Sequence, residues 1–310
     1  MINVTTQTYK NLKLILPNTN KALALALKNA NPAELQSLNQ PKDLGTILDS
    51  LLKQTLTSNE SQNRVLLDLL KNNPTLKSLS NATTTIKNLL QLLQQDKNPT
   101  QLEKTLQKFL GNIKDIHPKE LQTKLENSGV FLESKIKNMQ NPKELFSADL
   151  KAVLLKTQDE LNAVATPKNH EILKQIDKLT LQIDYQQLLS HLSNSSSIYI
   201  PYAWDKLKDG NINIKKAKDD RYFCDIHLEL QEYGEIDLRL AMFEKNQLSI
   251  NIATENVSLK NLLLQNIKAL KKQLSNAGII SKEIRFLEKK SNLYERDFND
   301  DLEMGFEVKV

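Results

Sequence analysis

The sequence predicts a multidomain α then α+β protein: an N-terminal bundle of short helices, then a mainly antiparallel sheet packed by one long helix. Three observations predict this. Up to about residue 190, apolar residues recur every three or four positions between prolines. From residue 196 onwards, apolar residues alternate with polar ones. A chain of 310 residues is long enough for two domains.

Proline marks the expected helix starts in the first part. In each start, a polar residue precedes a proline at the first helical position, where the missing N–H costs nothing. An acidic or amide side chain two residues later can reach back to the free amides. The five stretches are NPAEL (31–35), QPKDL (40–44), NPTQL (98–102), HPKEL (117–121) and NPKEL (141–145). Their spacing is irregular, so we expect about eight to ten short helices and no repeat of fixed period.

Apolar spacing and glycines predict the faces and ends of these helices. One face within 142–164 is expected to hold Phe146, Leu150, Val153, Leu154 and Leu161. Gly111 and Gly129 each follow a helical run and suit a left-handed cap.

The expected domain limits follow from these patterns. Residues 1–18 lack patterning and are predicted to be a mobile N-terminus, and residues 19–190 form the helical domain. A Ser-rich junction, SHLSNSSS at 190–197, separates them from an α+β domain at 196–290. Residues 291–310 form an acidic tail with room for one extra strand.

The second part predicts a sheet with one apolar face. The runs RYFCDIHLELQEY, GEIDLRLAMF and QLSINIA alternate with period two and predict three strands. The expected hairpins are at Tyr233-Gly234 and at 245–247. IYIP predicts a short edge strand that ends at Pro201, and Asp209-Gly210 predicts a turn into NINIKK.

A long helix is expected at about 257–277, and Gly278 is expected to end it. The residues expected to face the sheet are Val257, Leu263, Ile267, Leu270 and Leu274. The segment ISKEIRFLEK then predicts a further strand. Eleven of the 16 aromatic residues lie at or after Tyr199, as expected if a half-covered sheet needs bulky side chains. Trp204, the only tryptophan, is expected in the core of this domain.

Several function classes are disfavoured. The four histidines lie in separate segments, the glycines are isolated, and no nucleophile motif is present. We therefore expect no enzyme, no cofactor and no metal site. The single cysteine, Cys224, excludes an intramolecular disulfide and is expected to be a small buried apolar residue.

Nucleic-acid binding and direct membrane insertion are also not expected. Only five of the 42 basic residues are arginines, and the net charge of +5 is diffuse, whereas nucleic-acid sites cluster their cations. A nucleic-acid binder would lose affinity steeply with salt. No apolar run approaches the roughly 20 residues of a membrane span, so no direct membrane insertion is expected. The start MINVTTQTYK predicts no cleaved signal peptide.

A candidate contact surface follows from the strand alternation. If even-numbered residues face the helix, Phe223, His227, Arg239 and Phe243 share the opposite face. Two aromatic side chains on an otherwise solvated face indicate partner binding. The alternative is that the N-terminal helices or the segment GFEVKV (305–310) cover them.

Residues 228–279 resemble the C-terminal domain of the flagellar hook-length control proteins. Leu228 and Gly234 match the family's first turn, and Glu255-Asn256 match the pair before its Leu-rich helix. Further matches are Ile236, Leu238, Leu240, Leu262, Leu263, Leu270, Leu274, Gly278 and Ile279. Leu230 and Tyr233 depart from the family's usual Pro and Leu. LENSGVFLESKI (125–136) and SADLKAVLLK (147–156) are similar to central segments of shorter, helix-rich proteins that carry this domain.

The resemblance implies a role in flagellar type III export. Members of the family pass through the export apparatus, and an N-terminal part senses hook length. The C-terminal domain then contacts the cytoplasmic domain of the membrane export-gate switch protein, so that export changes from hook to filament subunits. Hook or hook-cap subunits would be further partners. The alternative is a cytoplasmic adaptor that uses the same domain without being exported.

Overall fold

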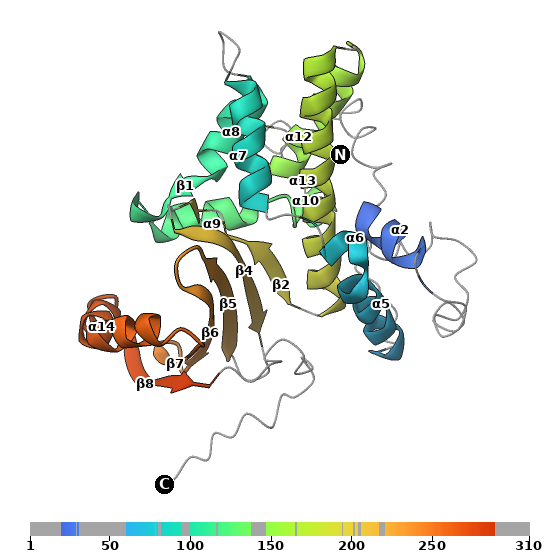
Figure 1. Cartoon of the computed structure of the whole chain (residues 1–310). Coiled ribbons are helices and arrows are strands. Elements are labelled where there is room, and N and C mark those ends of the chain that lie inside the picture. The colour runs from blue at the N-terminus through green and yellow to red at the C-terminus, as the bar shows by residue number, and fades with distance from the viewer. Residues whose placement is uncertain are drawn as a thin grey trace, which may run out of the picture. The chain divides into compact units, whose positions relative to one another are not determined.

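The computed structural model of the chain describes two sets of elements, helices first and a sheet afterwards (Figure 1). The described residues are 20–28, 30, 60–77, 79, 82–94, 100–115, 117–137, 147–164, 166–193, 195–200, 202–203, 206–216 and 221–288. The expected mobile N-terminus (1–18), Trp204 and the acidic tail (291–310) lie outside them, as do the helix starts expected at 31–35, 40–44 and 141–145.

The chain divides into two compact units. The helical unit comprises Met1–Leu192 with Ile198–Trp204, and the sheet unit comprises Ser193–Ser197 with Asp205–Val310. This order of helices and then a mainly antiparallel sheet with one long helix confirms the predicted fold class.

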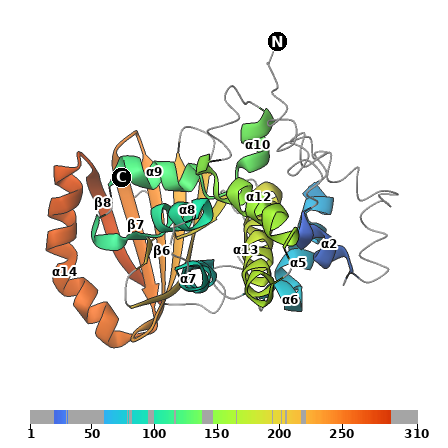
Figure 2. The same ribbon diagram turned by 90° about the horizontal axis from the view of Figure 1, so that it is seen from above.

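The helical unit is arranged around one long helix, α13 (Pro167–Leu192, 26 residues). The other described helices are α2 (Lys21–Lys28), α5 (Glu60–Asn72), α6 (Pro74–Lys77), α7 (Ala82–Leu93), α8 (Gln101–Phe109), α9 (Pro118–Glu126), α10 (Leu132–Lys137), α12 (Leu150–Asn162) and the 3₁₀ helix η1 (Ile113–Asp115). Figure 2 shows α2, α5 and α6 on one side of α13 and α7 and α8 on the other. The expectation of short helices alone is wrong for α13, because its apolar residues keep helical spacing for seven turns without a break.

Two apolar cores use α13. Ile172, Ile176, Leu179 and Ile183 of α13 pack in one core with residues of α7, α8 and α12. Leu188 and Leu192 pack in the other core with α2, α5 and α6. The predicted face of α12 is confirmed for Leu150, Val153, Leu154 and Leu161, and Phe146 lies outside the described residues. Because α13 runs to Leu192 and the first strand of the sheet begins at Ser196, the connection is shorter than the junction predicted at 190–197.

Buried polar contacts hold α2 against α13. The Asp184 carboxylate accepts a hydrogen bond from the Lys21 amide (2.9 Å), and the Asp184 carbonyl accepts one from the Asn20 side chain (3.0 Å). The Lys151 ammonium lies 2.8 Å from the same carboxylate, and both side chains are at most 1% exposed. Since an unpaired buried charge is costly, these contacts depend on one another.

The observed helix ends confirm some expected caps and correct others. Pro118 is the first residue of α9, as expected, but α8 begins at Gln101, after the N-cap Thr100 whose hydroxyl accepts from the Glu103 amide. Gly129 has φ = 89° and confirms the left-handed conformation.

Gly111 corrects the second cap prediction. It belongs to strand β1 (Gly111–Asn112), which pairs in parallel with β3 (Tyr202–Ala203), and it is not left-handed. An added Cβ there would lie 2.0 Å from the Lys124 ammonium and 3.2 Å from the Tyr202 ring. Gly111 therefore has no positive φ, and a side chain here would have to displace the Lys124 ammonium.

The six-stranded sheet has the order β2-β4-β5-β6-β7-β8. Its strands are β2 (Ser196–Tyr199), β4 (Leu207–Lys216), β5 (Tyr222–Leu230), β6 (Gly234–Phe243), β7 (Gln247–Thr254) and β8 (Ile280–Leu287). Strands β4 to β7 pair antiparallel, and helix α14 (Val257–Asn276) connects β7 to the parallel strand β8. The predicted edge strand, the three alternating strands, the helix and the last strand are confirmed.

The turn expected at Asp209-Gly210 is wrong. Both residues lie inside β4, where they pair with Glu229 and Leu228 of β5. Pairing continues to Leu207, which is buried, so the strand runs past the turn signal. The pairing is irregular between Leu207 and Asp209, where β4 has one more residue than β5, as in a β-bulge.

Candidate partner-binding face of the sheet

Helix α14 covers one face of the sheet and contacts β7 and β8. Apolar residues at even positions form its core with the helix: Leu228, Leu230, Ile236, Leu238, Leu240, Met242, Leu248, Ile250, Ile252, Ile284 and Phe286. The alternation thus places even-numbered strand residues on the helix side, which is the condition on which the candidate surface was predicted.

The ends of α14 are defined by side-chain and backbone caps. The Asn256 side chain accepts from the Leu259 amide (2.9 Å), and Gly278 has φ = 77° after the last turn. Leu263, Leu270 and Leu274 face the sheet as expected. Val257 is 69% exposed, so its predicted inward position is wrong, and Leu259 is buried instead. The two positions differ by about 200° around the helix, because each residue turns it by about 100°.

Odd-numbered residues form the opposite face, which we call the odd face. Phe223, Asp225 and His227 of β5 lie directly opposite Ala241, Arg239 and Asp237 of β6. Phe243 lies opposite Gln247 of β7. The structure therefore places the four predicted residues, Phe223, His227, Arg239 and Phe243, on one face.

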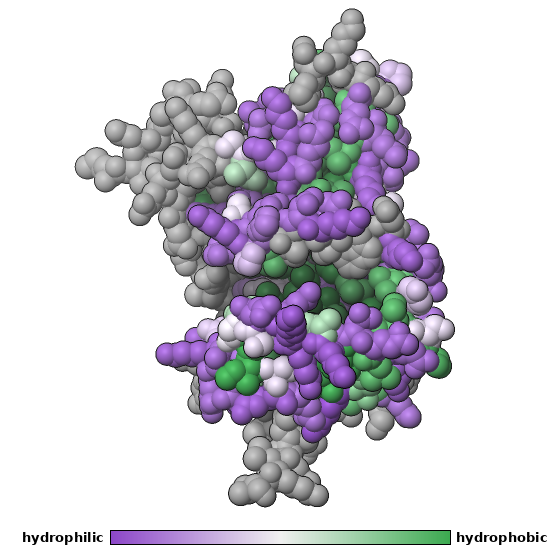
Figure 3. Space-filling view, turned by 90° about the vertical axis from the view of Figure 1, so that its left-hand side faces the viewer, coloured by the Kyte–Doolittle hydropathy of each residue, from purple (hydrophilic) through white to green (hydrophobic). Residues whose placement is uncertain are grey.

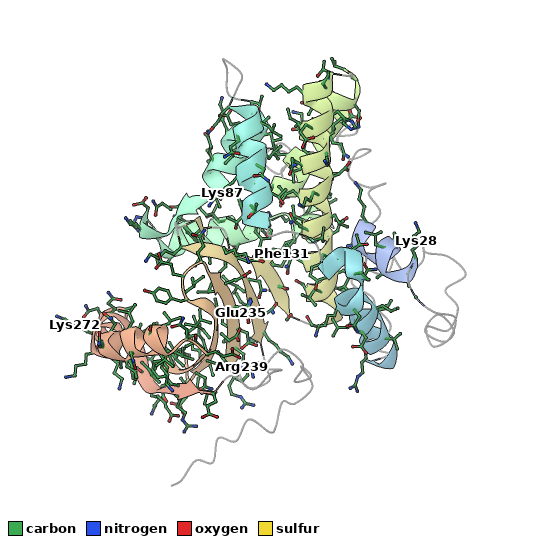
Figure 4. All side chains as sticks on the ribbon, viewed as in Figure 1. Lys28, Lys87, Phe131, Glu235, Arg239 and Lys272 are labelled. Carbon is green, nitrogen blue, oxygen red and sulfur yellow. The ribbon has the colours of Figure 1, made fainter. Side chains whose placement is uncertain are left out.

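Two side-chain pairs cross this face between β5 and β6. The Arg239 guanidinium donates to both oxygens of Asp225, with Nε–Oδ1 at 2.6 Å and Nη2–Oδ2 at 3.0 Å. His227 Nδ1 lies 2.7 Å from Asp237 Oδ1. Figure 4 labels Arg239 on β6, where it shares its face with Glu235. Because the Arg239 guanidinium and the His227 ring already have carboxylate partners, they tie β5 to β6 across this face.

Asp225 and Asp237 were not predicted as part of this surface. The alternation that selects Arg239 and His227 also places these carboxylates on the odd face, and directly opposed strand residues interact. The missing information was the register between β5 and β6, which a hairpin sequence alone does not determine.

The two phenylalanines are the apolar members of the four predicted residues. Phe223 and Phe243 are half-buried and lie at the ends of β5 and β6 away from their connecting turn. The directly opposed neighbours of Phe223 are Lys215 and Ala241. Neither of these cross-strand neighbours is a bulky apolar side chain.

Among the described residues, no group of three or more His, Cys, Asp or Glu side chains is placed to hold a metal ion. Cys224 is half-buried rather than fully buried, and burial followed by the nearby Asp225 charge raises the pKa of its thiol to about 11. A thiol with that pKa is a poor nucleophile at neutral pH. None of the described helices has both the length and the apolar character that a membrane span needs.

The comparison with protein families matches the sheet unit. The family model described as "Flagellar hook-length control protein FliK" matches residues 210–293, which run from β4 through α14 and β8. No curated protein and no solved structure shows a significant match to the chain. The match confirms the resemblance expected at 228–279 and extends it at both ends. The chain therefore carries, at residues 210–293, the domain of the flagellar hook-length control protein family.

Proposed function

We propose that the sheet unit switches the substrate class of a flagellar type III export apparatus by binding the cytoplasmic domain of the export-gate switch protein. The observation that carries this proposal is the hook-length control family match over residues 210–293. A sheet with one face packed by its own helix suits protein binding, because its other face can contact a partner. The switch itself requires binding and no covalent chemistry by this chain.

The odd face supplies the contact in this proposal. Phe223 and Phe243 provide apolar contact area, and the Arg239–Asp225 and His227–Asp237 pairs hold the strands that present them. Aromatic side chains dominate many protein interfaces, whereas charge pairs at the rim contribute little to affinity. Hook or hook-cap subunits would be further partners, and the chain would act in the cytoplasm before or without export.

The test is the affinity of the full chain for the purified cytoplasmic domain of the gate protein, measured by calorimetry. Phe223→Ser with Phe243→Ser should weaken binding by about tenfold or more, as expected for the loss of two aromatic contacts. Tyr222→Ser is the matched control, because Tyr222 is 43% exposed but points to the other face. Unchanged affinity in a folded double variant would remove the odd face from the proposal.

A second candidate function is a cytoplasmic adaptor that is not exported. It is favoured by the packing of the helical unit, where α13 serves two apolar cores and Asp184 is buried in contacts with α2 and α12. A unit packed in this way must unfold to pass a narrow channel. Detection of the intact chain in the medium of motile cells, but not of cells with a blocked export gate, separates the first candidate from the second.

A further inference from the structure

The surface of α14 that faces away from the sheet has an unusual composition. Val257, Lys260, Leu264, Lys268 and Lys271 follow one another at spacings of three or four residues and share one side of the helix. Lys272 lies beside Lys271, and Figure 4 labels it at the outer side of α14. We call these six residues the outer stripe. Its two apolar residues, Val257 and Leu264, lie in its first half together with Lys260, and its other three lysines form the second half.

The outer stripe carries uncompensated positive charge. The helix has four lysines and no acidic residue. Within the described part of the chain, none of these lysines forms an ion pair. Val257 and Leu264 are 69% and 46% exposed. Figure 3 views the side on which Figure 1 draws α14 and shows green apolar side chains among purple polar ones. A basic helix with exposed apolar residues is typical of a surface that meets an acidic, partly apolar segment.

The chain itself supplies such a segment in residues 291–310. Its acidic residues are Glu295, Asp297, Asp300, Asp301, Glu303 and Glu307, against only Arg296 and Lys309. Five of the six acids fall within 295–303, and the apolar pair Leu293-Tyr294 precedes them. The order along this segment, apolar and then acidic, is the order along the outer stripe.

The path of the chain matches this order. Leu287, at the end of β8, lies opposite Ala253, near the end of β7, and α14 begins at Val257 soon after β7. The chain therefore leaves β8 at the end of the unit where the apolar half of the stripe begins. Lys260 and Lys272 are about 18 Å apart along the helix. An extended chain spans roughly 3.3 Å per residue, so residues 288–303 are long enough to follow the stripe to its last lysine.

We infer that residues 291–303 dock along the outer stripe of α14 in the same molecule. Leu293 and Tyr294 cover Val257 and Leu264, and the acidic residues that follow pair with Lys268, Lys271 and Lys272. The tail then competes with any acidic partner for this side of the helix. This inference concerns α14 and does not depend on the proposed role of the odd face.

Carbodiimide cross-linking of the dilute full chain, followed by mass spectrometry, tests the docking. The expected products join Lys260, Lys268, Lys271 or Lys272 to carboxylates within 295–303. Lys206 and Lys208 are the matched controls, because they are exposed lysines paired with Glu232 and Glu229 in the same unit. Their cross-links to the tail should be at least about fivefold rarer, since random encounters lack a specific partner. Salt at about 0.5 M should reduce the tail cross-links, because it screens exposed charges.

Charge reversal separates docking from chance proximity. K268E/K271E/K272E should lower the yield of tail cross-links at Lys260 by about fivefold, and D297K/D300K/D301K should do the same. A chain that carries both triple substitutions should recover most of the yield, because the charges on the helix and on the tail are again opposite. Any of three results would overturn the inference. They are equal cross-link yields at Lys206 and Lys260, no recovery of yield in the chain with both triple substitutions, and cross-links found only between two chains.

Discussion

Arg239 and Asp225 form a two-point ion pair across adjacent strands of the sheet unit, with N–O distances of 2.6 and 3.0 Å. The two side chains are 26% and 21% exposed, so the pair is partly shielded from water. It joins β5 to β6 at the centre of the face that we propose as the contact surface.

Breaking this pair should destabilise the sheet unit moderately. Arg239→Ala should lower the free energy of unfolding by about 1–2 kcal/mol, between the values for exposed and buried pairs. Urea unfolding of Arg239→Ala, Asp225→Ala and the double variant measures the coupling between the two side chains. Additive effects of the single substitutions would show that the pair contributes no interaction energy of its own.

Gly129 should be far less tolerant of substitution than Gly278, although both have positive φ. An alanine Cβ at Gly129 would lie 2.7 Å from Lys151 Cβ and 2.9 Å from the Lys151 amide nitrogen. At Gly278 nothing lies within 4 Å, so only the backbone conformation opposes the change. We expect a loss of about 1 kcal/mol for Gly278→Ala and roughly 3 kcal/mol for Gly129→Ala, measured by denaturant unfolding. Equal losses at the two sites would contradict the close packing around Gly129.

The thiol of Cys224 should report whether the sheet unit is folded. Its pKa of about 11 in the folded protein lies above the ordinary 9.0, so the folded state disfavours the thiolate. This raised pKa lowers stability as pH rises from about 9 towards 11, because the unfolded chain loses the proton first. At pH 8 we expect iodoacetamide to label the native chain at least about tenfold more slowly than the urea-unfolded chain. Equal labelling rates would show that the Cys224 thiol is not shielded.

The sequence predicts most of the sheet unit, because its signals are local. Alternation from Tyr222 to Leu230 and from Ile236 to Met242 depends on one buried face, and that face exists in the structure. The helix following Asn256 has a cap that can be read from the sequence. Asp209-Gly210 misled the prediction because pairing with β5 outweighs the local turn preference.

Other features depended on information that a single sequence does not carry. The length of α13 follows from two separate cores that share one helix, and Asp184 is buried because three segments distant in sequence meet there. Gly111 lies close to Tyr202, which is far along the chain. For the candidate surface, alternation could assign Phe223, His227, Arg239 and Phe243 to one face. Only the strand register showed which carboxylates pair with Arg239 and His227.

The central claim is that the domain at residues 210–293 controls flagellar hook length by switching export. Hook length in electron micrographs of cells that lack this protein tests it most directly, with the wild-type chain and the Phe223→Ser, Phe243→Ser variant reintroduced in turn. We expect abnormally long hooks without filaments, corrected by the wild-type chain and not by the variant. Hooks of normal length bearing normal filaments in the cells without the protein would contradict it.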